Sequence, residues 1–317
     1  MKPSHRRTAP LVGVSLLLLS AACAGDAASD RYPADADAPA LRIVATSSIV
    51  ADWVRQVGGD RVAVFSLPRL GGDPHTFQPS ARDIARVADA DLVVSVGLDL
   101  EGRWLDELVS GAATEESKLM ELGPAADPVR SAAGRDDGHE GPLDPHFWFD
   151  PLRVKLAVSA ISARLSVEDP AAGEEYLEAA REYHRQLDGL HEWIQDQAGT
   201  LPRKRRLLVT SHDTLGYFGL LYEFEIVGAV IPGTTTEREP SPNEIARLVD
   251  RIRERNAPAI FVETALVGRL SLTVARETGA RVIDGLYTGS LGGPGSGAET
   301  YIEMMRSNVA RIVEALR

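Results

Sequence analysis

Three histidines with distinctive neighbours are the residues of this chain best suited to chemistry. They stand in Gly71-Gly72-Asp73-Pro74-His75-Thr76-Phe77, in Asp144-Pro145-His146-Phe147-Trp148 and in Thr210-Ser211-His212-Asp213. Imidazole nitrogen is a preferred ligand of zinc, and three neutral imidazoles with an open fourth position suit a tetrahedral ion better than magnesium or calcium, which favour oxygen. The three histidines therefore predict a divalent-metal site, with zinc as the first choice.

The alternative for each histidine is ordinary, because a single histidine in a loop is most often solvated or hydrogen-bonded in the interior. Two features of the sequence favour a metal site. His75 and His146 each directly follow Asp-Pro, in which the proline restricts the residue before it and can fix a rigid turn. His212 follows the apolar run 206–211, which predicts a buried strand, so this histidine should lie at the strand's carboxyl end, where open α/β sheets bind ligands.

The elements that must position these histidines are predicted from alternating strand and helix patterns. The expected strands are 41–46, 62–67 and 91–97, then 206–211, 225–231, 259–263 and 281–286. The expected helices are 48–57 and one opened by the capping box Ser80-Ala-Arg-Asp83 through 88, then 213–222, 243–255, 268–278 and 299–316. Such alternation predicts an α/β fold of two lobes, 41–168 and 201–317, each with a mostly parallel sheet flanked by helices.

A single long helix is predicted to join the two lobes, within residues 169–200. Its apolar residues recur at alternating spacings of four and three, which makes one stripe along a helix of about seven turns; they are Tyr176, Ala180, Tyr183, Leu187, Leu190 and Ile194. The connection contains only Gly189 and no proline between 174 and 198. We therefore expect a rigid link with limited closure of the lobes, and we expect His184 and His191 beside the stripe to be solvated.

The first 22 residues predict a secretory signal that is not part of the fold. A basic start is followed by a short apolar core, 11–19, which is too short for a transmembrane helix, and then by Ser20-Ala21-Ala22-Cys23. This ending is similar to the lipobox of bacterial lipoproteins, so residues 1–22 are interpreted as a lipoprotein signal peptide and Cys23 as a lipidated membrane anchor. A plain secretory signal with an incidental cysteine is the alternative. Residues 23–40 are small, acidic and contain proline, as is typical of a flexible tether.

Charge and cysteine content restrict the function further. Removal of the three basic residues within 1–22 changes the net charge from −12 to −15. An acidic chain argues against nucleic acid as a partner. It is compatible with attraction of cations, although a solubilising surface explains it as well. Cys23 is the one cysteine, so the mature chain can form neither an internal disulfide nor a thiolate zinc site.

The combined motifs resemble those of the zinc- and manganese-binding solute-binding lipoproteins of bacterial ABC importers, the TroA-like family. The resemblance covers essentially the whole mature domain; it includes Gly-Gly-Asp-Pro-His75, Asp-Pro-His146-Phe-Trp-Phe-Asp-Pro151, Ser-His212-Asp-Thr-Leu-Gly-Tyr-Phe218, Phe261-Val-Glu263 and Ala298-Glu-Thr-Tyr301. It implies two α/β lobes joined by one long helix, with the metal between them. His75 and His146 match the ligands from the first lobe, and His212 matches a third position that is His in zinc-type members and commonly Glu in manganese-type members.

The resemblance implies a function as an extracytoplasmic receptor that delivers its ion, most readily Zn²⁺, to a membrane permease and its ATPase. We expect a monomer, anchored to the outer face of the cytoplasmic membrane or periplasmic, that catalyses no reaction. Affinity should fall as the pH drops through about 6.5, because only unprotonated imidazole binds metal. Manganese or iron is the alternative cargo, a secreted zinc hydrolase is a remote alternative, and neither repeats nor a basic stripe support a primary role as an adhesin.

The chain departs from the family at one position. The family's usual fourth ligand is an aspartate before the final helix, and Gly289 stands there. We expect a bound water or hydroxide to complete the shell, with Glu263, Asp284, Glu237 or Glu239 as possible substitutes. Of these, Glu263 ends a predicted strand and is more plausibly a partner that orients a ligating imidazole.

Two glycine-containing loops have less specific sequences. Residues 131–142 lie where many zinc-type relatives carry a metal-gathering loop, but here the segment holds one histidine and three acids, and an ordinary surface loop is the better interpretation. Residues 292–297 are glycine-rich, yet they lack the Lys-Ser/Thr ending of a phosphate-binding loop, so they also predict a flexible loop.

Overall fold

The computed structural model describes residues 41–131, 141–264 and 268–317. The predicted signal peptide, the lipidated Cys23 and the tether lie outside the described residues. The same is true of 132–140, the middle of the proposed metal-gathering loop. None of the helices within the described ranges is long and apolar enough to cross a lipid bilayer.

Two four-stranded parallel sheets form the centres of the two lobes. The first contains β1 (Leu41–Ala45), β2 (Val62–Ser66), β3 (Leu92–Ser95) and β4 (Leu119–Glu121) in the order β2-β1-β3-β4. The second contains β5 (Leu207–His212), β6 (Glu225–Ile231), β7 (Ala259–Glu263) and β8 (Arg281–Leu286) in the equivalent order β6-β5-β7-β8. Every residue of β3, β5 and β7 is buried, because helices cover both faces of each sheet.

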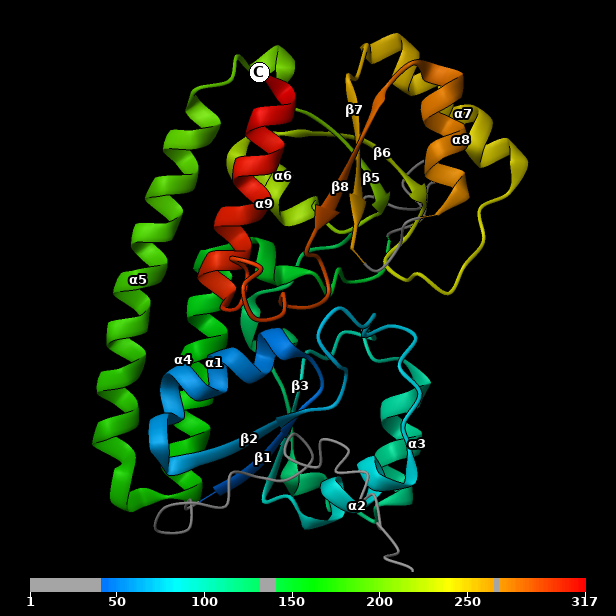
Figure 1. The fold of residues 1–317 in the computed structure, drawn as a ribbon. Helices are drawn as coiled ribbons and strands as arrows, with labels where there is room; N and C mark the ends of the chain where they lie inside the picture. The colour runs from blue at the N-terminus through cyan, green and yellow to red at the C-terminus, as the bar shows by residue number, and fades with distance from the viewer. Residues whose placement is uncertain (1–40, 132–140, 265–267) are drawn as a thin grey trace, which may run out of the picture.

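The helices follow the strands as the sequence patterns indicate. The first lobe holds α1 (Ser48–Gly58), α2 (Ala81–Asp89), α3 (Arg103–Gly111) and α4 (Pro151–Glu168), and the second holds α6 (Gly216–Tyr222), α7 (Pro242–Arg255), α8 (Arg269–Thr278) and α9 (Tyr301–Leu316). In the second lobe, α7 and α8 lie on one side of the sheet and α9 on the other (Figure 1). The capping box at Ser80 and Asp83 is present as predicted. Three elements, α3, α4 and β4, were not predicted from the sequence.

The long helix α5 (Gly173–Gly199) runs the length of the molecule beside both lobes (Figure 1). Its 27 residues span about 40 Å at 1.5 Å per residue. All six residues of the predicted stripe are buried. They face α1 and α4 of the first lobe and α9 and α6 of the second. The predicted joining helix is thus confirmed.

The expectation that His184 and His191 are solvated was wrong. Both side chains are half-buried. The Nε2 atom of His184 lies 3.0 Å from the Lys155 carbonyl oxygen, and Nδ1 of His191 lies 3.1 Å from the Tyr222 hydroxyl. The helices packed against α5, whose position the sequence did not define, supply these partners.

One apolar cluster crosses from lobe to lobe. It includes Trp53 and Phe147 of the first lobe together with Phe218 and Phe261 of the second. At the start of α9, the Tyr301 backbone N–H donates to Asp52 Oδ2 at 2.9 Å, and the Tyr301 hydroxyl donates to the Trp148 carbonyl at 2.6 Å. The segment between β8 and α9 therefore returns to the first lobe and ties it to the second.

Candidate metal centre

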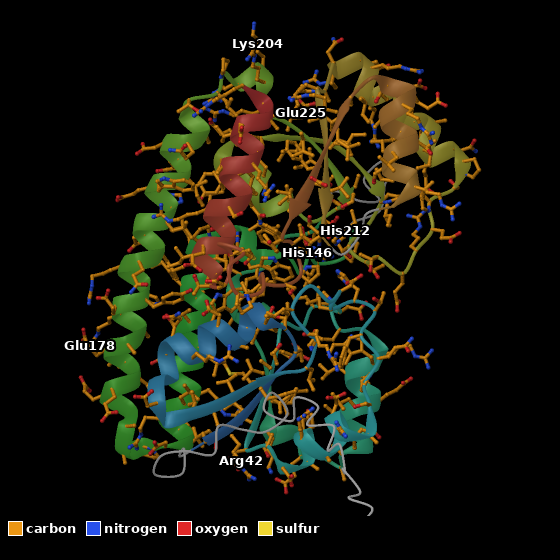
Figure 2. All side chains as sticks on the ribbon, in the orientation of Figure 1. Arg42, His146, Glu178, Lys204, His212 and Glu225 are labelled. Carbon is orange, nitrogen blue, oxygen red and sulfur yellow. The ribbon has the colours of Figure 1, made fainter. Side chains whose placement is uncertain are left out.

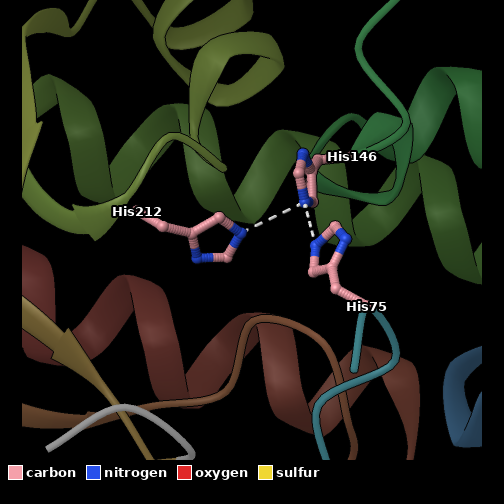
Figure 3. A group of neighbouring side chains, drawn as sticks. All are labelled: His75, His146 and His212. Atoms are coloured by element: carbon pink, nitrogen blue, oxygen red, sulfur yellow. Dashed lines mark hydrogen bonds between the residues drawn. The ribbon is translucent and has the colours of Figure 1, made fainter. Parts of the chain in front are cut away.

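The three predicted histidines come together between the lobes, although they are far apart in sequence. Nε2 of His146 lies 3.3 Å from Nε2 of His75 and 3.3 Å from Nε2 of His212 (Figure 3). The three residues are buried, with exposed fractions of 5%, 1% and 2% for His75, His146 and His212, respectively. His146 and His212 lie at the junction of the two lobes, as Figure 2 shows.

The spacing of these nitrogens suits a single ion. Two nitrogens at about 2.0–2.1 Å from a tetrahedral zinc stand about 3.3–3.4 Å apart. One ligand atom from each of the three rings can be chosen so that all lie within 4.8 Å of one another. Within the described ranges, no other group of at least three His, Cys, Asp or Glu side chains meets this criterion. The three rings could therefore form a metal site.

Neighbouring strands of the second lobe place His212 beside Glu263. Thr210 of β5 pairs with Phe261 of β7, so the residues two further along, His212 and Glu263, share one face at the carboxyl ends of the strands. The sheet's order reverses between these strands, and open α/β sheets bind ligands at such a point. The Glu263 carboxylate lies 2.5 Å from Nδ1 of His212 and accepts from the hydroxyls of Ser211 and Thr288. The expectation that Glu263 orients an imidazole agrees with this geometry.

A second carboxylate, whose role was not predicted from the sequence, holds His146. Oδ1 of Asp144 accepts the backbone N–H of His146 at 3.0 Å and lies 2.8 Å from its Nδ1. The Tyr217 hydroxyl of the second lobe donates to the Asp144 carbonyl at 2.7 Å. The signal for this role was present, because the aspartate of each Asp-Pro-His turn stands two residues before its histidine.

The turn that carries His75 is built differently. Oδ1 of Asp73 again accepts the backbone N–H of its histidine, at 2.9 Å. Its Oδ2, however, accepts from the Thr236 hydroxyl of the second lobe at 2.6 Å. Nδ1 of His75 is buried and has no hydrogen-bond partner among the described residues. The ring of His75 is thus the least constrained of the three.

The electrostatics favour unprotonated imidazoles in the first lobe. Burial lowers the pKa of His75 to about 3, and the neighbouring His146 and His212 add to this shift. Burial also lowers the pKa of His146. For His212 the effect of burial is outweighed by Glu263, which raises the pKa of this histidine and has its own pKa lowered in return. Two of the three rings are therefore ready to accept a cation without first losing a proton.

The candidates for a fourth ligand differ in their access to the site. Glu263 and Gly289 line the small cavity around the three rings. Asp284, Glu237 and Glu239 are exposed and do not line it, so the structure does not bring these three substitutes to the centre. The Glu263 carboxylate is already engaged by three partners. A water molecule is the remaining expectation for the fourth position.

The two glycine-containing loops contribute little to the centre. The described end of the 131–142 segment is held by the Ser131 hydroxyl, which donates to Asp213 at 3.2 Å. Residues 292–297 form turns between β8 and α9, as expected, and the Gly292 N–H donates to the Ala298 carbonyl at 2.8 Å.

Comparison with known proteins gives a consistent result. The family profile of "Zinc-uptake complex component A periplasmic" (ZnuA) matches residues 43–315. The chain is 35% identical to the manganese-binding lipoprotein MntA of Halalkalibacterium halodurans, over 95% of this chain and 96% of that protein. It is 30% identical to the manganese ABC transporter substrate-binding lipoprotein PsaA of Streptococcus pneumoniae, over 87% of this chain and 89% of the relative.

A solved structure matches the fold as well. The periplasmic zinc-binding protein TroA from Treponema pallidum superimposes with a TM-score of 0.79 at 28% identity, and the match covers 87% of this chain and 99% of that protein. The two-lobed α/β architecture predicted from the sequence is therefore that of a known metal-binding protein.

Proposed function

Because this chain belongs to the ZnuA family of periplasmic zinc-uptake components, and is thus a metal-binding substrate-binding protein of an ABC transporter, we propose that its cargo is zinc. His75, His146 and His212 bind the ion through Nε2. The observation that carries the proposal is the convergence of these three nitrogens, two pairs of which stand 3.3 Å apart, as a tetrahedral zinc requires.

The carboxylates around the site support zinc over a harder ion. Asp144 and Glu263 face the Nδ1 atoms of His146 and His212, so they orient the imidazoles and make them more basic. Their negative charges offset the charge of the ion without binding it directly. A water molecule completes the shell. Three nitrogens and one oxygen suit zinc better than manganese, which prefers oxygen ligands.

The bound ion is delivered, not transformed. A membrane permease and an ATPase receive it, and lipidated Cys23 anchors the monomeric receptor outside the cytoplasmic membrane through the 23–40 tether. Residues 41–168 and 201–317 act as the two lobes and residues 169–200 as the rigid link. Manganese-binding and zinc-binding relatives are both lipoproteins or periplasmic proteins by name, which supports this location.

Manganese is the second candidate cargo, and the names of the lipoproteins MntA and PsaA favour it. Because zinc outcompetes manganese at almost any nitrogen-rich site, affinity alone does not decide between them. The deciding experiment measures the metal content of the protein isolated from its native compartment, together with growth of a deletion strain under zinc or manganese starvation. Zinc in the protein and a zinc-specific growth defect support the proposal; manganese in both would replace it.

The roles of the ligands can be ranked by chelator competition. His212→Ala should nearly abolish zinc binding because a ligand is lost. Glu263→Ala should lower affinity by about 10–100-fold, as is typical for the hydrogen-bond partner of a ligand. His184→Ala removes a histidine of α5 that does not line the cavity around the three rings, so it serves as the control and should bind like the wild type. Equal losses for His212→Ala and Glu263→Ala would refute this ranking.

Hydrolysis stays a remote alternative. An open fourth position could activate water, as in zinc hydrolases. Zinc-dependent turnover of a chromogenic ester that disappears in His212→Ala would favour it, and absence of turnover in the zinc-loaded protein is the expected result.

A further inference from the structure

The position of His75 depends on its backbone turn and not on a partner of its ring. Nδ1 of His75 is buried without a hydrogen-bond partner in the described parts of the chain, whereas His146 and His212 each have a carboxylate at Nδ1. Whatever fixes the turn 71–75 must therefore also fix the ligand nitrogen.

Groups from both lobes hold this turn. Within the first lobe, the Trp104 indole N–H donates to the Pro74 carbonyl at 2.8 Å. From the second lobe, Ser290 Oγ accepts the Gly71 N–H at 2.7 Å, and the Thr236 hydroxyl donates to Asp73 at 2.6 Å. The second lobe thus supplies hydrogen bonds immediately before His75 in the sequence.

Gly289 directly precedes Ser290 and lies against the ring of Pro74. A Cβ atom at position 289 would stand 2.6 Å from Cδ and 3.1 Å from Cγ of Pro74, which is closer than carbon atoms approach without displacement. The φ angle of Gly289 lies outside the left-handed region, so the backbone itself would accept a side chain. The obstacle is the proline ring, and this ring is bonded into the turn directly before His75.

We infer that Gly289 is a positioning residue for His75. Because position 289 has no side chain, the Pro74 ring packs directly against the second lobe there, and we call this contact the seat of the turn. Hydrogen bonds from Ser290 and Thr236 hold the turn in the seat. The inference rests on the proposed function, because His75 must be a metal ligand for its position to matter to binding. In this chain a side chain at 289 pushes the Pro74 ring away from the second lobe and carries Nε2 of His75 away from the other two nitrogens. The aspartate that the resemblance implies at this position in the family supplies a ligand oxygen in return, whereas alanine supplies none.

The test compares Gly289→Ala with Gly293→Ala in the full chain. Gly293 lies in the same connection between β8 and α9, has no positive φ, and a Cβ there would meet nothing within 4 Å, so it is a matched control. Gly289→Ala should lower zinc affinity by about tenfold or more, the size of effect seen when the support of a ligand is lost. Gly293→Ala should bind like the wild type. Zinc affinity is measured by chelator competition.

Two further readouts separate positioning from general destabilisation. The visible spectrum of the Co²⁺-loaded Gly289→Ala protein should shift toward that of His75→Ala, and hydrogen exchange in the metal-free protein should rise in the peptide containing 71–75. The double variant Pro74→Ala/Gly289→Ala lacks the obstructing ring and should recover affinity to within about threefold of Pro74→Ala alone. If Gly289→Ala fails to fold, a double variant that folds and binds zinc still supports the inference, because only the obstructing ring has been removed.

The possible outcomes are distinct. A wild-type affinity, cobalt spectrum and exchange rate in Gly289→Ala would overturn the inference, as would a double variant that is not rescued. If the wild-type protein itself binds no zinc or cobalt, the proposed function fails. Faster hydrogen exchange at 71–75 in metal-free Gly289→Ala would then still support the packing of Pro74 on Gly289, whereas unchanged exchange would refute this packing role as well.

Discussion

The two Asp-Pro-His turns of the first lobe have the same local sequence but different surroundings. In both, the aspartate accepts the backbone N–H of the histidine two residues later, at 2.9 Å for Asp73 and 3.0 Å for Asp144. Asp144 also lies at hydrogen-bond distance from the ring of His146, whereas the second oxygen of Asp73 bonds to Thr236 of the opposite lobe. The carboxylate of Asp144 therefore holds the ring of its own histidine, whereas the carboxylate of Asp73 bonds to the partner lobe.

Burial of the flanking residues accounts for the difference. His146 is followed by Phe147, Trp148 and Phe149, all buried, so its turn belongs to the core. The turn before His75 is glycine-rich and follows Leu70, which is 52% exposed. A turn in the core can support a fixed ring, but a turn at the surface needs contacts from elsewhere. The comparison therefore separates His146, whose ring is held by its own turn, from His75, whose turn is held by hydrogen bonds from the second lobe.

The largest expected effect tests whether both turns supply a ligand at all. His146→Ala and His75→Ala should each reduce zinc affinity by more than the roughly 100-fold upper range for loss of a supporting partner, because each removes a ligating nitrogen. Competition with a chelator of known affinity measures both. Retention of near wild-type binding by His75→Ala would break the comparison, since its turn would then serve only to join the lobes.

A smaller effect tests which aspartate supports its ring. Asp144→Asn should lower zinc affinity by about 10–100-fold, because the carboxylate at Nδ1 of His146 loses its charge. Asp73→Asn is the matched control, since the equivalent residue of the other turn makes no hydrogen bond to the ring of its histidine. The zinc affinity of Asp73→Asn should fall by less than about threefold relative to the wild type. Comparable losses in the two variants would show that the ring contact is not what distinguishes the turns.

A still smaller effect is expected from loss of the hydrogen bond between Thr236 and Asp73, which joins the two lobes. Thr236→Val keeps the shape of the side chain but removes its hydrogen bond to Asp73. Since one hydrogen bond contributes about 0.5–1.5 kcal/mol, affinity should fall by less than about tenfold. Hydrogen exchange should rise around 71–75 and not around 144–146. Faster exchange at both turns would contradict the assignment of this contact to the His75 turn alone.

The smallest effect is a pH dependence of the metal-free protein. Burial raises the pKa of Asp144 to about 7, from an ordinary value near 3.8 in the unfolded chain. The native state therefore holds an extra proton between these values, and this carboxyl contributes a loss of stability as the pH rises from about 4 through about 7. The melting temperature of Asp144→Asn relative to the wild type should increase over that range. A difference that is constant with pH would show that Asp144 stays ionised.

The fold was largely predictable because its signals are local. The limits of β6, β7 and β8 agree with those predicted, and the buried stripe of α5 follows from its periodicity alone. The missed helix α4 had a usable signal, since Asp150 caps it and Pro151 begins it. The missed α3 begins at Arg103 after Gly102, which provides no side-chain cap, and β4 has only three residues, so neither gives a strong pattern.

The three histidines that converge at the candidate site were predictable, but most of the residues that hold them in place were not. The Asp-Pro-His repeats and the strand end at 212 identified the three histidines. The seat formed by Gly289, Ser290 and Thr236 was missed because these residues meet the His75 turn only when the two lobes pack together. The partner of His212 was anticipated from its place at a strand end, whereas the contact between Asp144 and the His146 ring was not.

The apolar cluster shared by the lobes has a consequence for how the molecule unfolds. Since Trp53 and Phe147 pack in one continuous interior with Phe218 and Phe261, neither lobe keeps a complete core when the other is lost. Heating should therefore melt the protein in a single calorimetric transition, and either half expressed alone should be unable to maintain its native structure. We therefore expect the two visible lobes to unfold as one cooperative unit.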